Sequence, residues 1–152
     1  MKTGSIELLK KIMERKQTET DKIELGTLML ELYERVEDYL QKNHGIRIRL
    51  NLYEGVDACV YGNKLGIWLC LEIVLYSFIE SCPNSGVIEF AMKNAEGRIW
   101  VFFSRNKEMG DMNIGFVNST VKEYLDSQNI LLRYAEGSAY EVKIGFCNMD
   151  GR

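Results

Sequence analysis

The stretch from Leu65 to Cys82 most constrains what this 152-residue chain can fold into. It reads LGIWLCLEIVLYSFIESC, its only charged residues are Glu72 and Glu80, and Pro83 follows it at once. About eighteen residues are too many for an ordinary strand, and proline cannot continue a helix, so the pattern predicts a helix over 65–82. A membrane span needs roughly twenty apolar residues and would place Glu72 near the bilayer centre. We therefore expect a buried core helix.

Glu72 is the residue of this helix that most needs an explanation. A carboxylate in such a segment lies at the helix surface, is hydrogen-bonded, or is functional. The sequence favours the first of these, a partly exposed position at the rim of the helix.

The amino-acid composition limits the classes of protein to which this chain can belong. With 46% apolar residues, 27% charged residues and one proline, the chain is typical of a single globular domain. The net charge of −3 offers no basic face for phosphates, so nucleic acid is not an expected partner. No cationic, apolar leader is visible at the start, and we expect a cytoplasmic protein without membrane insertion.

The metal-ligating residue types are few and scattered. The four cysteines form no C-x-x-C pair, and His44 is the only histidine. Neither a zinc site nor a disulfide framework is indicated, and we expect no metal site.

The hydrophobic periodicity predicts an order of helix, helix, strand, strand, helix, strand, strand, helix, strand, strand. The predicted helices span 5–16, 23–43, 65–82 and 115–127, and the predicted strands span 46–52, 58–61, 87–93, 98–104, 130–134 and 139–146. This order predicts an α+β two-layer sandwich, in which helices cover one face of a mixed, mostly antiparallel sheet. We divide the chain into an N-terminal amphipathic helix (1–20), a domain (21–148) and a tail (149–152).

Four segments on this framework resemble the ATP-binding catalytic domain of bacterial histidine kinases and the wider GHKL, or Bergerat, family. They are IRIRLNL, VYGNKLGIWLCLEIVLYSFIE, VIEFAMKNAEGRIWVFF and IGFVNSTVKEYLDSQNILLRYAEGSAYEVKIGF, and the resemblance covers about 23–146. The resemblance implies that the predicted two-layer sandwich has the fold of this family, the Bergerat fold.

The first family motif lies in the central helix, where an asparagine helps to hold Mg²⁺ against the nucleotide phosphates. In one register of the resemblance, Glu72 takes the first key position and Tyr76 takes that of the asparagine. Glu72 then matches the general base of the gyrase-like branch. A shift by one residue puts Ile73 and Ser77 there instead. The required asparagine is missing in both registers.

The other two family motifs are also altered. Where the family has Asp-x-Gly-x-Gly for adenine, this chain has Phe103 followed by Ser104, Arg105 and Asn106. We expect the Phe103 ring to fill the adenine space, with a burial worth about 2–3 kcal/mol to the fold. The glycine-rich phosphate loop is reduced to Gly110 and Gly115.

The resemblance therefore implies a degenerate domain that keeps the scaffold and has lost the nucleotide chemistry. We expect a vestigial nucleotide pocket without catalytic residues or cofactor, formed by Glu72, Tyr76, Phe103, Arg105 and Gly115. His44 stands at a predicted helix end, a poor place for a phosphoacceptor. The expected role is a non-catalytic, kinase-like module that works by protein–protein contact in two-component or related signalling.

Partners and alternative functions follow from the same resemblance. The partner would be a kinase, a response regulator or a second copy of the chain. An apolar stripe in the first helix either pairs with that second copy or packs on its own domain; it consists of Ile6, Leu9, Ile12 and Met13. One alternative function is a working GHKL protein, a histidine kinase or anti-sigma-type kinase that binds ATP and Mg²⁺ with divergent motifs. Another is a small-ligand sensor that reuses the old pocket.

Overall fold

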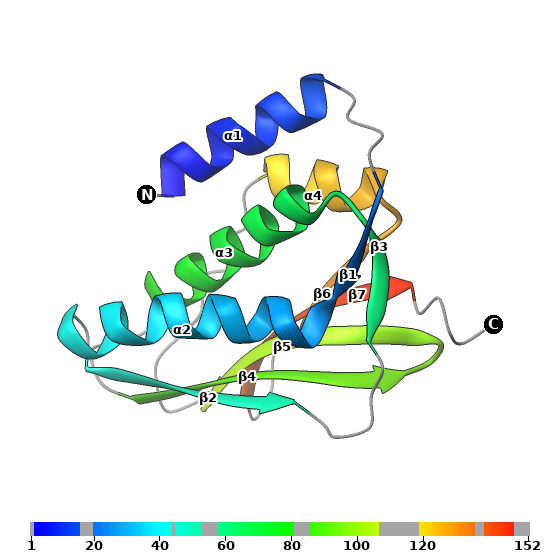
Figure 1. Cartoon of the computed structure of the whole chain (residues 1–152). Helices are drawn as coiled ribbons and strands as arrows, with labels where there is room; N and C mark the ends of the chain where they lie inside the picture. Colours follow the sequence, from blue (N-terminus) through cyan, green and yellow to red (C-terminus); the bar gives the residue numbers. More distant parts are fainter. Residues whose placement is uncertain are drawn as a thin grey trace.

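A computed structural model describes residues 2–15, 20–43, 45–52, 58–80, 86–106, 119–135 and 139–147 (Figure 1). The helices are α1 (Lys2–Glu14), α2 (Leu25–Asn43), α3 (Lys64–Glu80) and α4 (Ser119–Ser127). The strands are β1 (Asp21–Glu24), β2 (Ile46–Leu52), β3 (Cys59–Gly62), β4 (Gly86–Ala95), β5 (Arg98–Asn106), β6 (Leu131–Ala135) and β7 (Ala139–Cys147).

The main sheet has five strands in the order β2-β4-β5-β7-β6. Only the β2–β4 pair is parallel, and the other pairs are antiparallel. Figure 1 shows the helices on one face of this sheet, with α1 lying over α3 and α4 on the side away from it. The predicted α+β sandwich with a mixed, mostly antiparallel sheet is confirmed.

The core lies between the sheet and α3. Alternate residues of β4, β5 and β7 are buried on the helix side, as the period of two in a strand requires. At its centre the Phe103 ring of β5 stacks on Phe90 of β4, with 4.8 Å between ring centroids. Phe78 of α3 completes the group at 6.4 Å from Phe103. Each of these rings is fully buried and contributes about 2–3 kcal/mol.

Helix α3 is apolar on nearly every side because other elements surround it. It contacts α1, α2 and α4 and covers the sheet. Asn63 caps its first turn, since the Asn63 side-chain oxygen accepts a hydrogen bond from the Gly66 N–H at 2.9 Å. The prediction of a buried central helix is confirmed from Lys64 to Glu80.

One strand is absent from the sequence prediction. Residues Asp21–Glu24, which the prediction divides between a polar break and a helix, form β1 and pair antiparallel with β3 in a separate two-stranded sheet. Ile23 lies opposite Val60, and the Leu25 N–H donates to the Ala58 carbonyl. Four residues are too few to show the alternation of apolar and polar residues that marks a strand. Their conformation depends instead on pairing with a partner strand that is distant in sequence.

Several predictions lie outside the described residues. They concern the helix start at 115–118, the glycines Gly110 and Gly115, His44, and the tail 149–152. Among the described helices, none combines the length and the apolar character that crossing a membrane would require.

Candidate functional site

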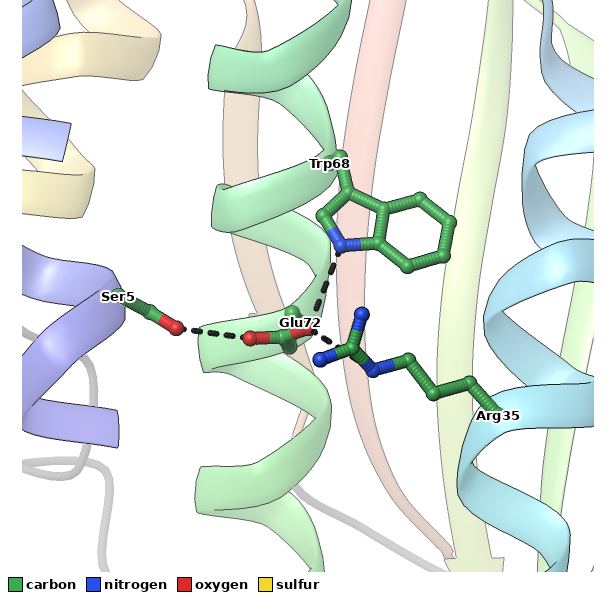
Figure 2. Close-up of polar contacts among 4 residues, drawn as sticks. All are labelled: Ser5, Arg35, Trp68 and Glu72. Atoms are coloured by element: carbon green, nitrogen blue, oxygen red, sulfur yellow. Dashed lines mark hydrogen bonds and ion pairs between the residues drawn. The ribbon is translucent and has the colours of Figure 1, made fainter. Parts of the chain in front are cut away.

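Glu72 is the centre of a polar cluster between α1, α2 and α3 (Figure 2). One carboxylate oxygen, Oε1, accepts a hydrogen bond from the Ser5 hydroxyl at 2.7 Å. The other, Oε2, accepts one from the Trp68 indole N–H at 3.2 Å. The residue is only 6% exposed. The expectation of a partly exposed rim position was therefore wrong, because α1 covers this face of the helix.

Three helices bring these side chains together. Trp68 and Glu72 are four residues apart on α3, so they lie on the same face one turn apart. Ser5 reaches Glu72 from α1, and Arg35 approaches from α2. The cluster thus ties the N-terminal helix to the domain.

The charge of Glu72 is compensated by hydrogen bonds and by a neighbouring cation. Arg35 Nε lies 3.9 Å from Glu72 Oε2, an ion-pair distance that is too long for a hydrogen bond. The Arg35 side chain is 58% exposed, whereas that of Glu72 is 8% exposed. A buried carboxylate is costly unless polar partners satisfy it, and Ser5 and Trp68 do so here.

A pocket of about 310 Å³ opens beside this cluster. Its lining residues come from all three helices: Gly4, Ser5, Leu8, Arg35, Leu65, Trp68, Leu69 and Glu72. Apolar side chains dominate the lining. Two of them, Leu8 and Leu65, are 40% and 47% exposed.

Tyr76 lies one turn beyond Glu72 and faces α2. Its ring meets that of Tyr39 edge-on, with centroids 5.9 Å apart and an interplanar angle of 68°. Burial raises the pKa of Tyr76, and the charges of Glu72 and Tyr39 add to this rise, while Arg35 opposes it. Tyr76 is thus an ordinary neutral packing residue near the cluster.

Phe103 and Arg105 are grouped around a different face of α3. Both contact Phe78, which points to the sheet, and the Arg105 guanidinium lies 5.7 Å from the Phe78 ring centroid. Arg105 is 2% exposed. The structure therefore separates the predicted pocket residues: Glu72 and Tyr76 face α2, and Phe103 and Arg105 lie by the sheet. Gly115 is outside the described residues.

In the second register of the central motif, Ile73 and Ser77 take the two key positions. Both are buried, and the Ser77 hydroxyl donates a hydrogen bond to the Ile73 carbonyl at 2.8 Å. Such a bond to the preceding turn is the usual way to satisfy a serine inside a helix.

The apolar stripe of α1 faces its own domain. Leu9 and Ile12 are buried, and Ile6 and Met13 are partly buried against the core. Helix α1 contacts both α3 and α4. Packing on the domain therefore accounts for the stripe, while its use toward a second copy stays a prediction.

The sequence reasoning missed three members of the cluster: Ser5, Arg35 and Trp68. The i, i+4 spacing of Trp68 and Glu72 could have predicted their hydrogen bond. Ser5 and Arg35 carry no local signal, because only the packing of α1 and α2 brings them to Glu72.

No protein-family model matches the sequence. No curated protein matches it either. Solved structures do match, among them the histidine kinase AdeS of Acinetobacter baumannii, with a TM-score of 0.72 at 11% identity over 97% of this chain and 76% of that chain.

Two further solved structures of histidine kinases match this chain to a similar degree. A structure of the catalytic domain of the histidine kinase ThkA gives a TM-score of 0.71 at 14% identity, covering 89% of this chain and 100% of that one. The cytoplasmic segment of the histidine kinase QseC gives 0.71 at 15% identity, over 95% and 88% of the two chains. The chain has the fold of histidine kinase catalytic domains.

Proposed function

We propose that this chain is a non-catalytic, kinase-like module that acts by protein–protein contact in two-component or related bacterial signalling. One observation carries the proposal. In both registers of the family resemblance, the side chain at the asparagine position of α3 packs or hydrogen-bonds inside the core. Tyr76 packs on Tyr39, and Ser77 bonds the backbone of Ile73.

A magnesium ligand at this position would need an accessible oxygen. Mg²⁺ requires near-octahedral geometry and usually keeps several waters, so its protein ligands must border an open site. The Ser77 hydroxyl belongs to a residue that is 1% exposed, and Tyr76 offers a bulky phenol whose pKa is raised. Both arrangements oppose metal-nucleotide binding.

Glu72 has a structural role in this chain. Its two carboxylate oxygens accept hydrogen bonds from Ser5 of α1 and from Trp68 of α3. These bonds hold α1 against the domain and satisfy a buried carboxylate. This role favours the non-catalytic proposal over the alternative of a working ATPase or kinase that depends on Glu72.

The position of α1 supports the same conclusion. The family resemblance puts the nucleotide phosphates between the central helix and the loop before the last helix. Here α1 packs against both α3 and α4. We take this packing of α1 on both helices to favour a role in contact rather than in nucleotide turnover.

Nucleotide binding gives the first test. Calorimetry and thermal unfolding with ATP or ADP plus Mg²⁺ should show no binding and no change in melting temperature, with a histidine kinase catalytic domain of known ATP affinity as a positive control. A Kd below about 100 μM for either nucleotide would contradict the proposal.

The signalling role needs a separate test. Purified histidine kinases and response regulators of the host should be assayed for phosphotransfer with and without this chain. We expect the chain to bind one of them and change its rate of phosphorylation without itself being phosphorylated. Phosphate incorporation into the chain, or no effect on any member of the set, would count against the proposal.

A further inference from the structure

We propose that the pocket between α1, α2 and α3 binds a small apolar amino acid, or a molecule with the same neighbouring ammonium and carboxylate groups on an apolar body. The inference depends on the paired charges of Glu72 and Arg35 at one pocket. It does not depend on the proposed signalling role.

The floor of the pocket is suited to a cation. Glu72 is the most buried charged group that lines it. An ionised carboxylate has about four lone-pair sites, and Ser5 and Trp68 occupy two of them. A ligand ammonium group can therefore bond to Glu72 without displacing either protein donor.

The rim of the pocket is suited to an anion. Arg35 is more than half exposed and is not hydrogen-bonded to Glu72, because the distance is 3.9 Å. A guanidinium group presents a planar fork of N–H donors that matches a carboxylate. Arg35 can thus hold a ligand carboxylate while its charge still faces Glu72.

The rest of the lining is suited to an apolar body. It is formed by Leu8, Leu65, Trp68 and Leu69. Gly4 leaves space at the α1 side, since a Cβ added there would meet nothing within 4 Å. A volume of about 310 Å³ lies at the small end of the range for ligand sites, about 300–1,000 Å³.

The charges select among small ligands. An amine without a carboxylate would bring its charge near the like charge of Arg35, and an acid without an amine would approach Glu72 with a like charge. A phosphate ester would suffer the same repulsion. A zwitterion complements both groups at once.

Calorimetry on the full chain tests the ligand class. L-phenylalanine and L-leucine are the probes, and phenethylamine and phenylpropionate are matched compounds that each lack one charge. We expect at least one amino acid to bind, and each matched compound to bind at least tenfold more weakly than L-phenylalanine. The proposal is overturned if neither amino acid binds with a Kd below about 10 mM, or if either matched compound equals L-phenylalanine.

Variants test the site. Arg35→Gln and Glu72→Gln should each weaken binding at least tenfold. Leu8→Trp should block it by filling the mouth of the pocket. Arg49→Gln is the matched control, because Arg49 is exposed on β2, away from the pocket lining.

Each variant must first show the circular dichroism spectrum of the folded chain. Should Glu72→Gln fail to fold, Arg35→Gln and Leu8→Trp decide the question, since the Arg35 side chain is 58% exposed and Leu8 is 40% exposed. Unchanged affinity in either of these two variants contradicts the proposed site. None of these outcomes bears on nucleotide binding or phosphotransfer, so the two proposals fail independently.

Discussion

At the scale of single residues, Glu72 links the N-terminal helix to the domain. Its two carboxylate oxygens receive hydrogen bonds from different helices, Ser5 on α1 and Trp68 on α3. Removing the carboxylate would leave the Trp68 N–H without its acceptor in a partly buried place, and such a loss costs about 1–3 kcal/mol.

We therefore predict different effects for two substitutions of this residue. Glu72→Ala should lower the free energy of unfolding by about 2 kcal/mol. Glu72→Gln should cost less than about 1 kcal/mol, because an amide can accept from Trp68 and donate to Ser5. Urea denaturation measures both, with Glu31→Ala on the exposed face of α2 as the control. Equal losses for Ala and Gln would mean that the charge matters rather than the hydrogen bonds.

Tyr124 of α4 is another buried residue with a polar group. In the part of the chain that the structure describes, its hydroxyl has no hydrogen-bond partner. Burial raises the pKa of Tyr124 to about 12, and the neighbouring Cys70 adds to this rise. The folded chain thus holds this proton more tightly than the unfolded chain does, whose tyrosine pKa is about 10. The corresponding stability is complete below about pH 10 and is lost as the pH rises through about 12.

Tyr124→Phe should therefore be neutral or stabilising at about pH 7, because it removes a buried group without a partner. Between about pH 9 and pH 11 this variant should lose less stability than the parent chain. Urea unfolding at both pH values measures the difference, with the exposed Tyr61→Phe as control. A loss above about 1 kcal/mol at neutral pH would show that the hydroxyl has a bonding role.

At the scale of the elements, the close approach of α3 and α4 depends on Gly66. A Cβ added at Gly66 would overlap the Tyr124 hydroxyl and ring. Glycine inside a helix normally costs about 1 kcal/mol relative to alanine, so its presence here is explained by packing.

Gly66→Ala should accordingly destabilise the chain by about 1–3 kcal/mol, against the trend of helix propensity. Gly4→Ala in α1 is the matched control, since nothing lies within 4 Å of the added Cβ, and it should stabilise by about 0.5–1 kcal/mol. Thermal unfolding monitored by circular dichroism distinguishes the two signs. A stabilising Gly66→Ala would disprove the close contact.

The elements also show what the sequence could predict. Helix α3 and the paired strands β4–β5 and β6–β7 follow from long apolar runs and short polar turns, which are local signals. Strand β1 does not, because its conformation depends on the distant Val60. The candidate site was predictable at Glu72, whose charge stands out in an apolar helix, and at Trp68, which lies four residues before it on the same helix. Ser5 and Arg35 join it through tertiary packing alone.

At the scale of the whole molecule, α1 packs its apolar stripe on its own domain. Leu9 is fully buried against the core, while Leu8, its neighbour in sequence, is 40% exposed. A fully buried leucine replaced by alanine typically costs about 2–5 kcal/mol, whereas a surface change usually costs no more than about 0.5 kcal/mol.

Leu9→Ala should therefore lower the free energy of unfolding by about 2–4 kcal/mol, and Leu8→Ala by less than about 1 kcal/mol. Both values should be independent of protein concentration, because the contacts lie within one chain. A melting temperature of the parent chain that rises with concentration, and no longer does so in Leu9→Ala, would assign the stripe to an interface between copies.

The parallel pairing of β2 with β4 has a kinetic consequence. Residues as distant in sequence as Ile46 and Gly86 must meet before this edge of the sheet can form, and α3 lies between them. Local hairpins close quickly, whereas pairing across a long intervening segment is slow, because the loop entropy is lost before the contact is gained. We therefore expect strand β2 to join the sheet late. Before it does, a refolding chain would contain the hairpin β4–β5 with the outer edge of β4 still exposed to other chains.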